Sequence, residues 1–136
     1  AQWNEQFESF EGSTPDMLRF CMRIWWESVG STKVAGITKL MLSEGRNFPE
    51  LAAFYQKEFV EPAHELLRKV LRRGIDRGEF APVDVDLAIY TVLAPMVFLM
   101  IWQHSACVED NFDPEKYLEL QIETLLNGLV VQRSKP

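Results

Sequence analysis

The segment from Phe48 to Asp84 constrains the fold most strongly, because its pattern predicts one helix of unusual length. Apolar side chains recur there every three or four positions, which is the spacing of one helix face. The first row consists of Leu51, Tyr55, Phe59, Ala63, Leu66 and Val70, and beside it lies a second row of Val60, Leu67, Leu71 and Ile75. Two adjacent rows make a wide apolar stripe, so we expect this helix to contact several neighbours.

Prolines and a glycine mark the course of this helix. Pro49 suits the first helical turn, where its missing N–H removes no helical hydrogen bond. Pro62 lies inside the pattern and does remove a main-chain hydrogen bond, which predicts a kink near Val60–Glu61. Gly78 can adopt the left-handed conformation that commonly ends a helix. The sequence therefore predicts a long helix that bends once and ends near Gly78.

The segment Val85–Trp102, VDLAIYTVLAPMVFLMIW, is apolar on nearly every side of the helix it predicts, and Asp84 is placed to cap its start. Asp86, Thr91 and Pro95 interrupt the run, and the longest apolar part, after Thr91, is 11 residues. This is shorter than the ~20 residues that a bilayer requires, so we expect a buried core helix and no membrane partner. A helix that is apolar all round must be covered on nearly all sides, which favours a partner subunit.

Start and stop signals predict further helices before and after these two segments. A first helix is predicted before Gly12 by the helical spacing of Trp3, Phe7 and Phe10. A second helix starts at Thr14-Pro15-Asp16 and runs through about Val29, and a short third one starts at Ser31 and Thr32 and ends at Gly45. The last helix starts at Asp113-Pro114. No region shows the sustained alternation or the hairpin dipeptides of strands. The predicted fold class is therefore all-α, a bundle of five to six helices in a single domain, residues 1–136.

The last helix carries an apolar row at steps of four, three and four, which is the spacing of a coiled-coil seam. The row consists of Leu118, Ile122, Leu125 and Leu129, and Leu126 and Val130 widen it. Such a seam predicts that the last helix packs lengthwise against another helix.

Composition limits the classes of function. The chain has 136 residues and a formal net charge of −6, which argues against nucleic-acid binding by this chain alone, since such binding needs a positive surface. Cys21 and Cys107 form neither a disulfide framework nor a metal-binding spacing, which favours a reducing cytoplasm. The sequence starts with Ala1, shows no signal peptide and has no initiator Met, from which we expect a fragment or a trimmed product.

Catalytic groups are sparse. His64, His104, Cys21, Cys107 and Ser105 are the candidate nucleophiles or bases, and no Gly-rich phosphate loop, HExxH or GxSxG sequence occurs. His104 and Cys107, with Glu109 and Asp110 close behind, have a spacing that could contribute to a metal site, although such groups are common by chance at helix ends. We therefore expect no enzyme, no cofactor and no metal centre.

The run FPELAAFYQKEFVEPAHELLRKVLRRGIDRGEF, the turn at Pro82–Asp86 and the following LAPMVF core resemble the C-terminal regulatory domain of the tetracycline-repressor (TetR) family. The resemblance covers roughly Phe48 to Trp102. It implies a helical domain that encloses a small-molecule effector and forms a homodimer, in which the last two helices of each subunit build a four-helix bundle. Residues 1–11 would be the tail of the helix that follows the DNA-binding head, and residues 85–131 would hold the dimerisation helices.

The resemblance assigns the seam Leu118, Ile122, Leu125 and Leu129 to the dimer interface. DNA would be bound only through an N-terminal head with a helix-turn-helix, and nothing in this sequence resembles one, so we expect a sensor and dimerisation module without that head.

Large and adaptable side chains supply candidate walls for an effector pocket, since aromatics and Met offer contact area with few geometric demands. They are Trp3, Phe7, Phe10, Met17, Phe20, Cys21, Ile24, Trp25, Tyr55, Phe59, Met96 and Met100. They lack charge, which favours a small hydrophobic or aromatic effector. The alternative is that these residues form a plain core, in which case the domain would be a helical protein-interaction or scaffold domain with no ligand.

Overall fold

The computed structural model describes residues 8–32, 34–103 and 111–131, and the secondary structure of this part is helical apart from one isolated bridge between Phe80 and Val130. The elements are α2 (Thr14–Trp25), a π-helical turn η1 (Trp26–Gly30), α3 (Val34–Glu44), a 3₁₀ turn η2 (Gly45–Asn47), α4 (Pro49–Tyr55), a π-helical turn η3 (Gln56–Val60), α5 (Glu61–Asp76), α6 (Val85–Trp102) and α7 (Pro114–Leu129). The predicted all-α class is confirmed. Trp3 and Phe7, in the first predicted helix, lie outside the described residues.

Side-chain caps set where the helices begin. Asp84 accepts a hydrogen bond from the Leu87 N–H at 3.2 Å, and Asp113 accepts one from the Glu115 N–H at 3.0 Å, so both predicted starts are confirmed. The start of α2 differs by one residue from the expectation, because Ser13 caps the helix and Thr14 is its first residue. Each cap satisfies an N–H group that has no partner inside the helix.

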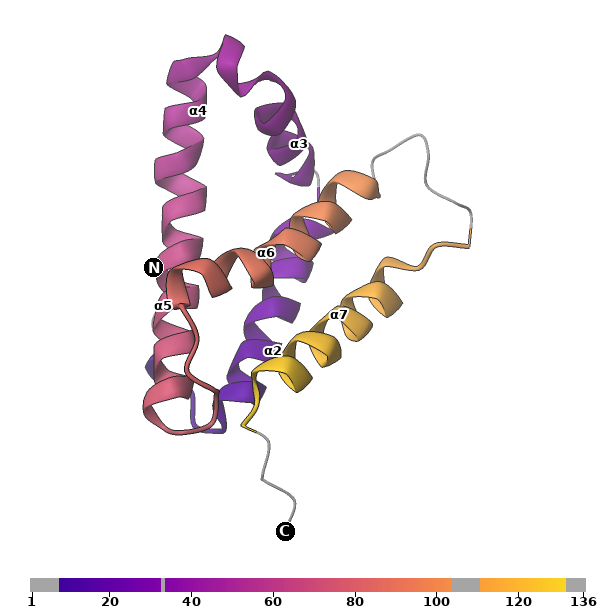
Figure 1. Cartoon of the computed structure of the whole chain (residues 1–136). Coiled ribbons are helices and arrows are strands. Elements are labelled where there is room, and N and C mark those ends of the chain that lie inside the picture. Colours follow the sequence, from indigo (N-terminus) through magenta and orange to yellow (C-terminus); the bar gives the residue numbers. More distant parts are fainter. Residues whose placement is uncertain (1–7, 33, 104–110, 132–136) are drawn as a thin grey trace.

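The long helix predicted from the first segment is formed by α4, η3 and α5, which follow one another in a continuous column (Figure 1). The kink expected near Pro62 takes the form of the π-helical turn Gln56–Val60, which ends immediately before Glu61, the first residue of α5. Proline cannot donate the helical hydrogen bond, and widening the preceding turn accommodates that loss. The C-terminal end of the helix is also as expected, since Gly78 has a φ of 73°.

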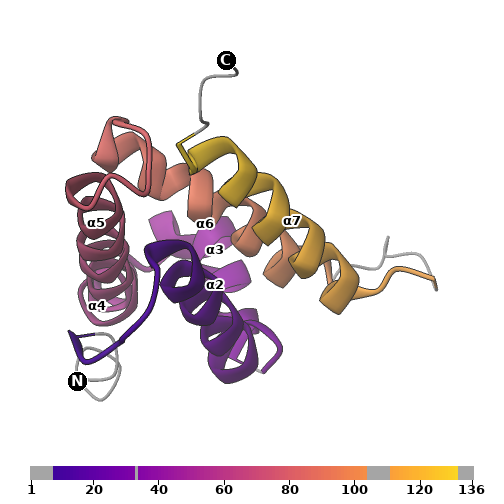
Figure 2. The ribbon, with the colours of Figure 1, turned by 90° about the horizontal axis from the view of Figure 1, so that it is seen from below.

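Four helices, α2, α5, α6 and α7, surround the hydrophobic core, and α3 lies on α6 (Figures 1 and 2). The largest fully buried side chains come from all four of these helices and from the α5–α6 loop: Phe80, Leu18, Met22, Leu71, Ile89, Leu99, Leu118 and Ile122. In contrast, α4 packs mainly against its own chain neighbours η2 and η3. We call the span α3–η2–α4, residues 34–55, the α3–α4 arch, because it rises away from the core in Figure 1.

A polar network ties the start of α2 to the end of α5. Thr14 is fully buried, and its N–H and hydroxyl donate to the Glu79 carboxylate at 2.7 and 2.8 Å. Arg73 donates to the Thr14 hydroxyl at 2.7 Å and to the Gly12 carbonyl at 2.8 Å, while Arg77 pairs with Glu79 at 3.1 Å. The residues that lead into α2 are therefore fixed by charged groups from a segment about sixty positions later in the chain.

Candidate functional site

Two opposite sides of α6 are apolar, and only one of them is covered by this subunit. The side toward the core is buried and consists of Val85, Ile89, Val92, Met96, Leu99 and Met100. On the other side, the exposed fractions are 66% for Leu87, 60% for Tyr90 and 45% for Phe98. Large apolar side chains left in water in this number are unfavourable, so the exposed side of α6 is suited to contact with another surface.

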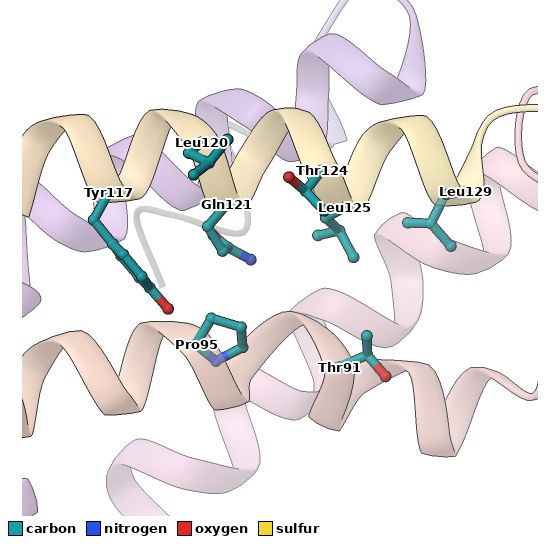
Figure 3. Close-up of a pocket in the computed structure, with 9 residues that line it drawn as sticks. Thr91, Pro95, Tyr117, Leu120, Gln121, Thr124, Leu125 and Leu129 are labelled. Atoms are coloured by element: carbon teal, nitrogen blue, oxygen red, sulfur yellow. The ribbon is translucent and has the colours of Figure 1, made fainter.

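The exposed side of α6 continues into an apolar groove of about 490 Å³ between α6 and α7 (Figure 3). The groove is lined by Thr91, Pro95, Tyr117, Leu120, Gln121, Thr124, Leu125, Gly128 and Leu129. A second hollow of about 280 Å³ shares Thr91, Leu125 and Leu129 with it and extends the apolar surface to Val83 and Leu87. We call this continuous surface, the lining of the two hollows, the α6–α7 face.

Most of the dimer seam predicted from sequence is buried within the subunit itself. Leu118, Ile122 and Leu129 are 2%, 0% and 7% exposed because they pack into the core of their own subunit. Leu125 is half-buried and lines both hollows, and the mostly buried Leu129 also lines both, so these two of the four border the α6–α7 face. The apolar spacing indicates that one side of the helix is packed, but the same spacing is expected whether that side packs on the core of its own subunit or on a partner subunit. The groove is also lined by α7 residues that the predicted seam does not contain: Tyr117, Leu120, Gln121, Thr124 and Gly128.

A third side of α7 is engaged with α2 through ion pairs. Arg19 lies 2.7 Å from Glu123, and Arg23 pairs with Glu119. With the core on one side and α2 on another, the α6–α7 face is the side of α7 that this subunit leaves open.

The effector residues predicted from sequence fall into two groups, and the first belongs to the core. Met17, Cys21, Met96 and Met100 are between 2% and 6% exposed and pack among other core side chains. Burial raises the pKa of the Cys21 thiol to about 12, which keeps it protonated and unreactive. These four residues therefore act as core packing in this structure, and the aromatic and Met pattern did not distinguish core from pocket.

The second group is partly accessible. The rings of Phe10 and Phe20 lie 5.8 Å apart, and Tyr55 stacks on Phe59 at 5.3 Å next to the π-helical turn. Ile24 and Trp25 are half-buried on α2. The Tyr55 hydroxyl also forms a hydrogen bond with the buried Thr38 hydroxyl, which joins the two sides of the α3–α4 arch. Neither of the two hollows on the α6–α7 face touches any residue of this group.

Comparison with known protein families decides the assignment of this helical arrangement. Residues 11–114 match the model of the family described as tetracyclin repressor-like, C-terminal domain. The chain belongs to this family. The matched range contains α2 to α6 and ends where α7 begins, so the groove lies between the last matched helix and the helix that follows it. No curated protein and no solved structure matches the chain.

In this tetracyclin repressor-like domain, the described residues provide no group of three or more His, Cys, Asp or Glu side chains arranged to hold a metal ion. The candidate metal-binding residues His104, Cys107, Glu109 and Asp110 lie outside the described part of the chain. His64, the other histidine, contacts the Tyr90 ring edge-on at 5.4 Å. The family is a regulatory one, and this contact adds no catalytic constellation to it.

One helix of the described residues, Val85–Trp102, is long and apolar enough to cross a membrane by length and composition alone. The core helix of a soluble protein satisfies the same criteria, and six residues of this helix are buried in the core of the subunit.

Proposed function

We propose that the chain is the ligand-sensing and dimerisation domain of a TetR-like transcriptional regulator of the cytoplasm. The observation that carries this proposal is the α6–α7 face, a continuous apolar surface on the last two helices of a domain of this family. A second copy placed on this face would bury the exposed sides of α6 and α7 in both subunits at once. The product would be a bundle of four helices around a two-fold axis.

Dimerisation is the part of the proposal that the geometry supports most directly. Leu87 and Leu120 are each about two-thirds exposed, at 66% and 67%, and both lie along the face. Complete burial of such side chains contributes about 1.5–3 kcal/mol each. Sedimentation equilibrium at micromolar concentration should give twice the subunit mass of 15.8 kDa.

The effector part of the proposal rests on accessible aromatic residues: Tyr55 and Phe59 at the α4 end of the α3–α4 arch, and Phe20 on α2. Tyr55 and Phe59 offer stacked rings, Phe20 is 38% exposed, and the Thr38–Tyr55 hydroxyl pair supplies a polar contact. This set suits a small, uncharged apolar or aromatic molecule. The arch is held on α6 through α3, whereas α4 packs mainly against its chain neighbours, so a ligand at the α4 side of the arch could shift that side at low cost.

A thermal-shift screen of uncharged aromatic and aliphatic small molecules tests the sensor proposal. A ligand present at 100 times its Kd should stabilise the native domain by about 2.7 kcal/mol and raise Tm by several degrees. Phe59→Ala should abolish that rise. Phe98→Ala is the matched control, because Phe98 is also 45% exposed but lies on α6, and it should keep the rise relative to its own Tm.

The competing function is a helical protein-interaction or scaffold domain that binds no ligand. The observation in its favour is that both hollows lie on the α6–α7 face and not among the predicted effector residues. A dimer that shows no thermal shift with any compound would favour this alternative. A shift that survives Phe59→Ala but is lost in Phe98→Ala would instead place a ligand on α6 and refute the proposed effector site.

In the proposed regulator, the effector would act through its different affinities for two subunit geometries. DNA-binding heads on the two subunits of a dimer must reach successive major-groove faces, about 34 Å apart. A ligand that favours a geometry with another spacing lowers operator affinity by that difference alone. DNA binding would thus be modulated by the effector although this domain makes no contact with DNA.

A further inference from the structure

Gln121 is the one side chain among the described residues whose buried polar atom has no hydrogen-bond partner. Its Oε1 atom is covered by the chain itself, and its amide extends from α7 toward α6 in the groove (Figure 3). The surroundings are mostly apolar, with Pro95, Leu120 and Leu125 among the lining residues. A buried amide oxygen without a partner costs about 1–3 kcal/mol, so its place in the middle of an apolar face needs a physical reason.

We propose that Gln121 pairs with the Gln121 of a second copy across the two-fold axis of the dimer, an inference that rests on the proposed dimerisation through the α6–α7 face. A primary amide carries both an N–H₂ donor and a carbonyl acceptor, so two amides related by a two-fold axis form two reciprocal hydrogen bonds. Rotation about the terminal torsion of Gln121 can turn the end of the amide, with its oxygen and one N–H together, toward the partner, because that torsion has a broad energy profile.

The position of Gln121 on α7 is consistent with a place on the axis. It is the eighth residue of the 16-residue helix, and lining residues lie on both sides of it, Tyr117 one turn before and Thr124 one turn after. In a two-fold interface, the residue that lies on the axis meets its own copy, while residues on either side meet each other's positions. Gln121 is thus the central polar residue of the face.

The consequence is that Gln121 sets the register of the dimer. The remaining contacts of the face are mostly apolar, and apolar contacts are largely insensitive to a shift along α7. A shift by one helical turn would leave two buried amides without partners, which disfavours the wrong register. The amide would therefore contribute specificity, while the apolar residues contribute most of the affinity.

Charge exchange at position 121 tests the pairing. In Gln121→Glu, two carboxylates face each other across the axis, and in Gln121→Lys two ammonium groups do, so each variant should dimerise at least tenfold more weakly than the unmodified chain. An equimolar mixture of the two variants should form a heterodimer, with the affinity recovered, because opposite charges now face each other. Sedimentation equilibrium on each variant and on the mixture measures this, and circular dichroism checks that each remains folded.

Asn127→Glu and Asn127→Lys are the matched controls. Asn127 is exposed on the same helix, about 120° around it from Gln121, and does not line the groove. Both controls should dimerise as the unmodified chain does. The pairing is refuted if the Gln121 variants dimerise normally, or if both are monomeric and their mixture stays monomeric. A monomeric unmodified chain would instead refute the proposed dimer itself.

Discussion

At the scale of single residues, the Glu79 carboxylate accepts two hydrogen bonds from Thr14 and pairs with Arg77. Its burial alone would raise the pKa of the carboxyl group, but hydrogen bonds from the Thr14 N–H and hydroxyl and the charges of Arg77 and Arg73 outweigh that effect. The net result is a lowered pKa, which means that the folded state favours the ionised carboxylate. The fixed connection between α2 and α5 therefore depends on a negative charge at this position.

This charge predicts a pH-dependent stability. Because the folded pKa of Glu79 is lowered, its contribution is fully present above the unfolded pKa of about 4.3 and is lost as the pH falls through the folded pKa. Glu79→Gln should lower the free energy of unfolding by about 2 kcal/mol at pH 7. The substitution removes the charge, and the amide N–H₂ group cannot accept the hydrogen bond that one Thr14 donor makes to the carboxylate. The difference from the unmodified chain should shrink as the pH is lowered below 4.

Urea unfolding at a series of pH values and a fixed protein concentration measures this effect. Glu65→Gln is the control, because Glu65 is exposed and its ion pair is with Arg68, one turn away on the same helix. A surface pair of this kind contributes at most about 0.5 kcal/mol. If both variants lose the same small amount at every pH, the proposed role of the Glu79 charge is wrong.

At the scale of the helices, two glycines within helices should respond in opposite directions to the same substitution. A Cβ on Gly74 of α5 would lie 2.2 Å from Cδ2 of the buried Phe80 ring, whereas a Cβ on Gly36 of α3 meets nothing within 4 Å. Gly74→Ala should therefore destabilise the domain by about 1–3 kcal/mol, because the core is overpacked. Gly36→Ala should stabilise it by about 0.5–1 kcal/mol, because only the helix propensity changes.

Denaturant unfolding of the two variants checks this pair at one protein concentration, since dimerisation would make the stability concentration-dependent. An equal gain in both variants would show that Phe80 does not pack on α5 as described. An equal loss in both would show that α3 is not a regular helix around Gly36.

The course of the helices was predictable from local signals in the sequence. Asp84, Asp113 and Gly78 act through their own backbone neighbours, and such chemistry can be read without knowledge of the fold. The π-helical turn before Pro62 was predicted only as a kink, because the way in which a helix absorbs a missing hydrogen bond depends on the packing of its neighbours. The partner of Thr14 could not be predicted, since Glu79 is 65 positions away.

The candidate site was less predictable than the fold, for a related reason. The apolar spacing of Leu118, Ile122 and Leu129 correctly places them on a packed face, but periodicity does not tell a core inside one subunit from an interface between two. The same ambiguity applies to Met17, Cys21, Met96 and Met100, which proved to be core residues. One signal was available in the sequence: α6 is apolar all round, and a single subunit covers only one side of it.

At the scale of the whole molecule, the central claim is that the domain dimerises through the α6–α7 face. Leu120 is the sharpest probe of this claim, because it is 67% exposed and a charge there should leave the subunit folded. Leu125 is a poorer probe, since it also packs against the core. Leu42 provides the matched control, because it is 62% exposed but lies on α3, away from the face.

The deciding measurement is the solution mass of the unmodified chain, Leu120→Glu and Leu42→Glu by sedimentation equilibrium at micromolar concentration. We expect the unmodified chain and Leu42→Glu to have twice the mass of the 15.8 kDa subunit, and Leu120→Glu to have the mass of one subunit while keeping its helical circular dichroism. An unmodified chain that is monomeric, or a Leu120→Glu variant that is as dimeric as Leu42→Glu, would contradict the claim.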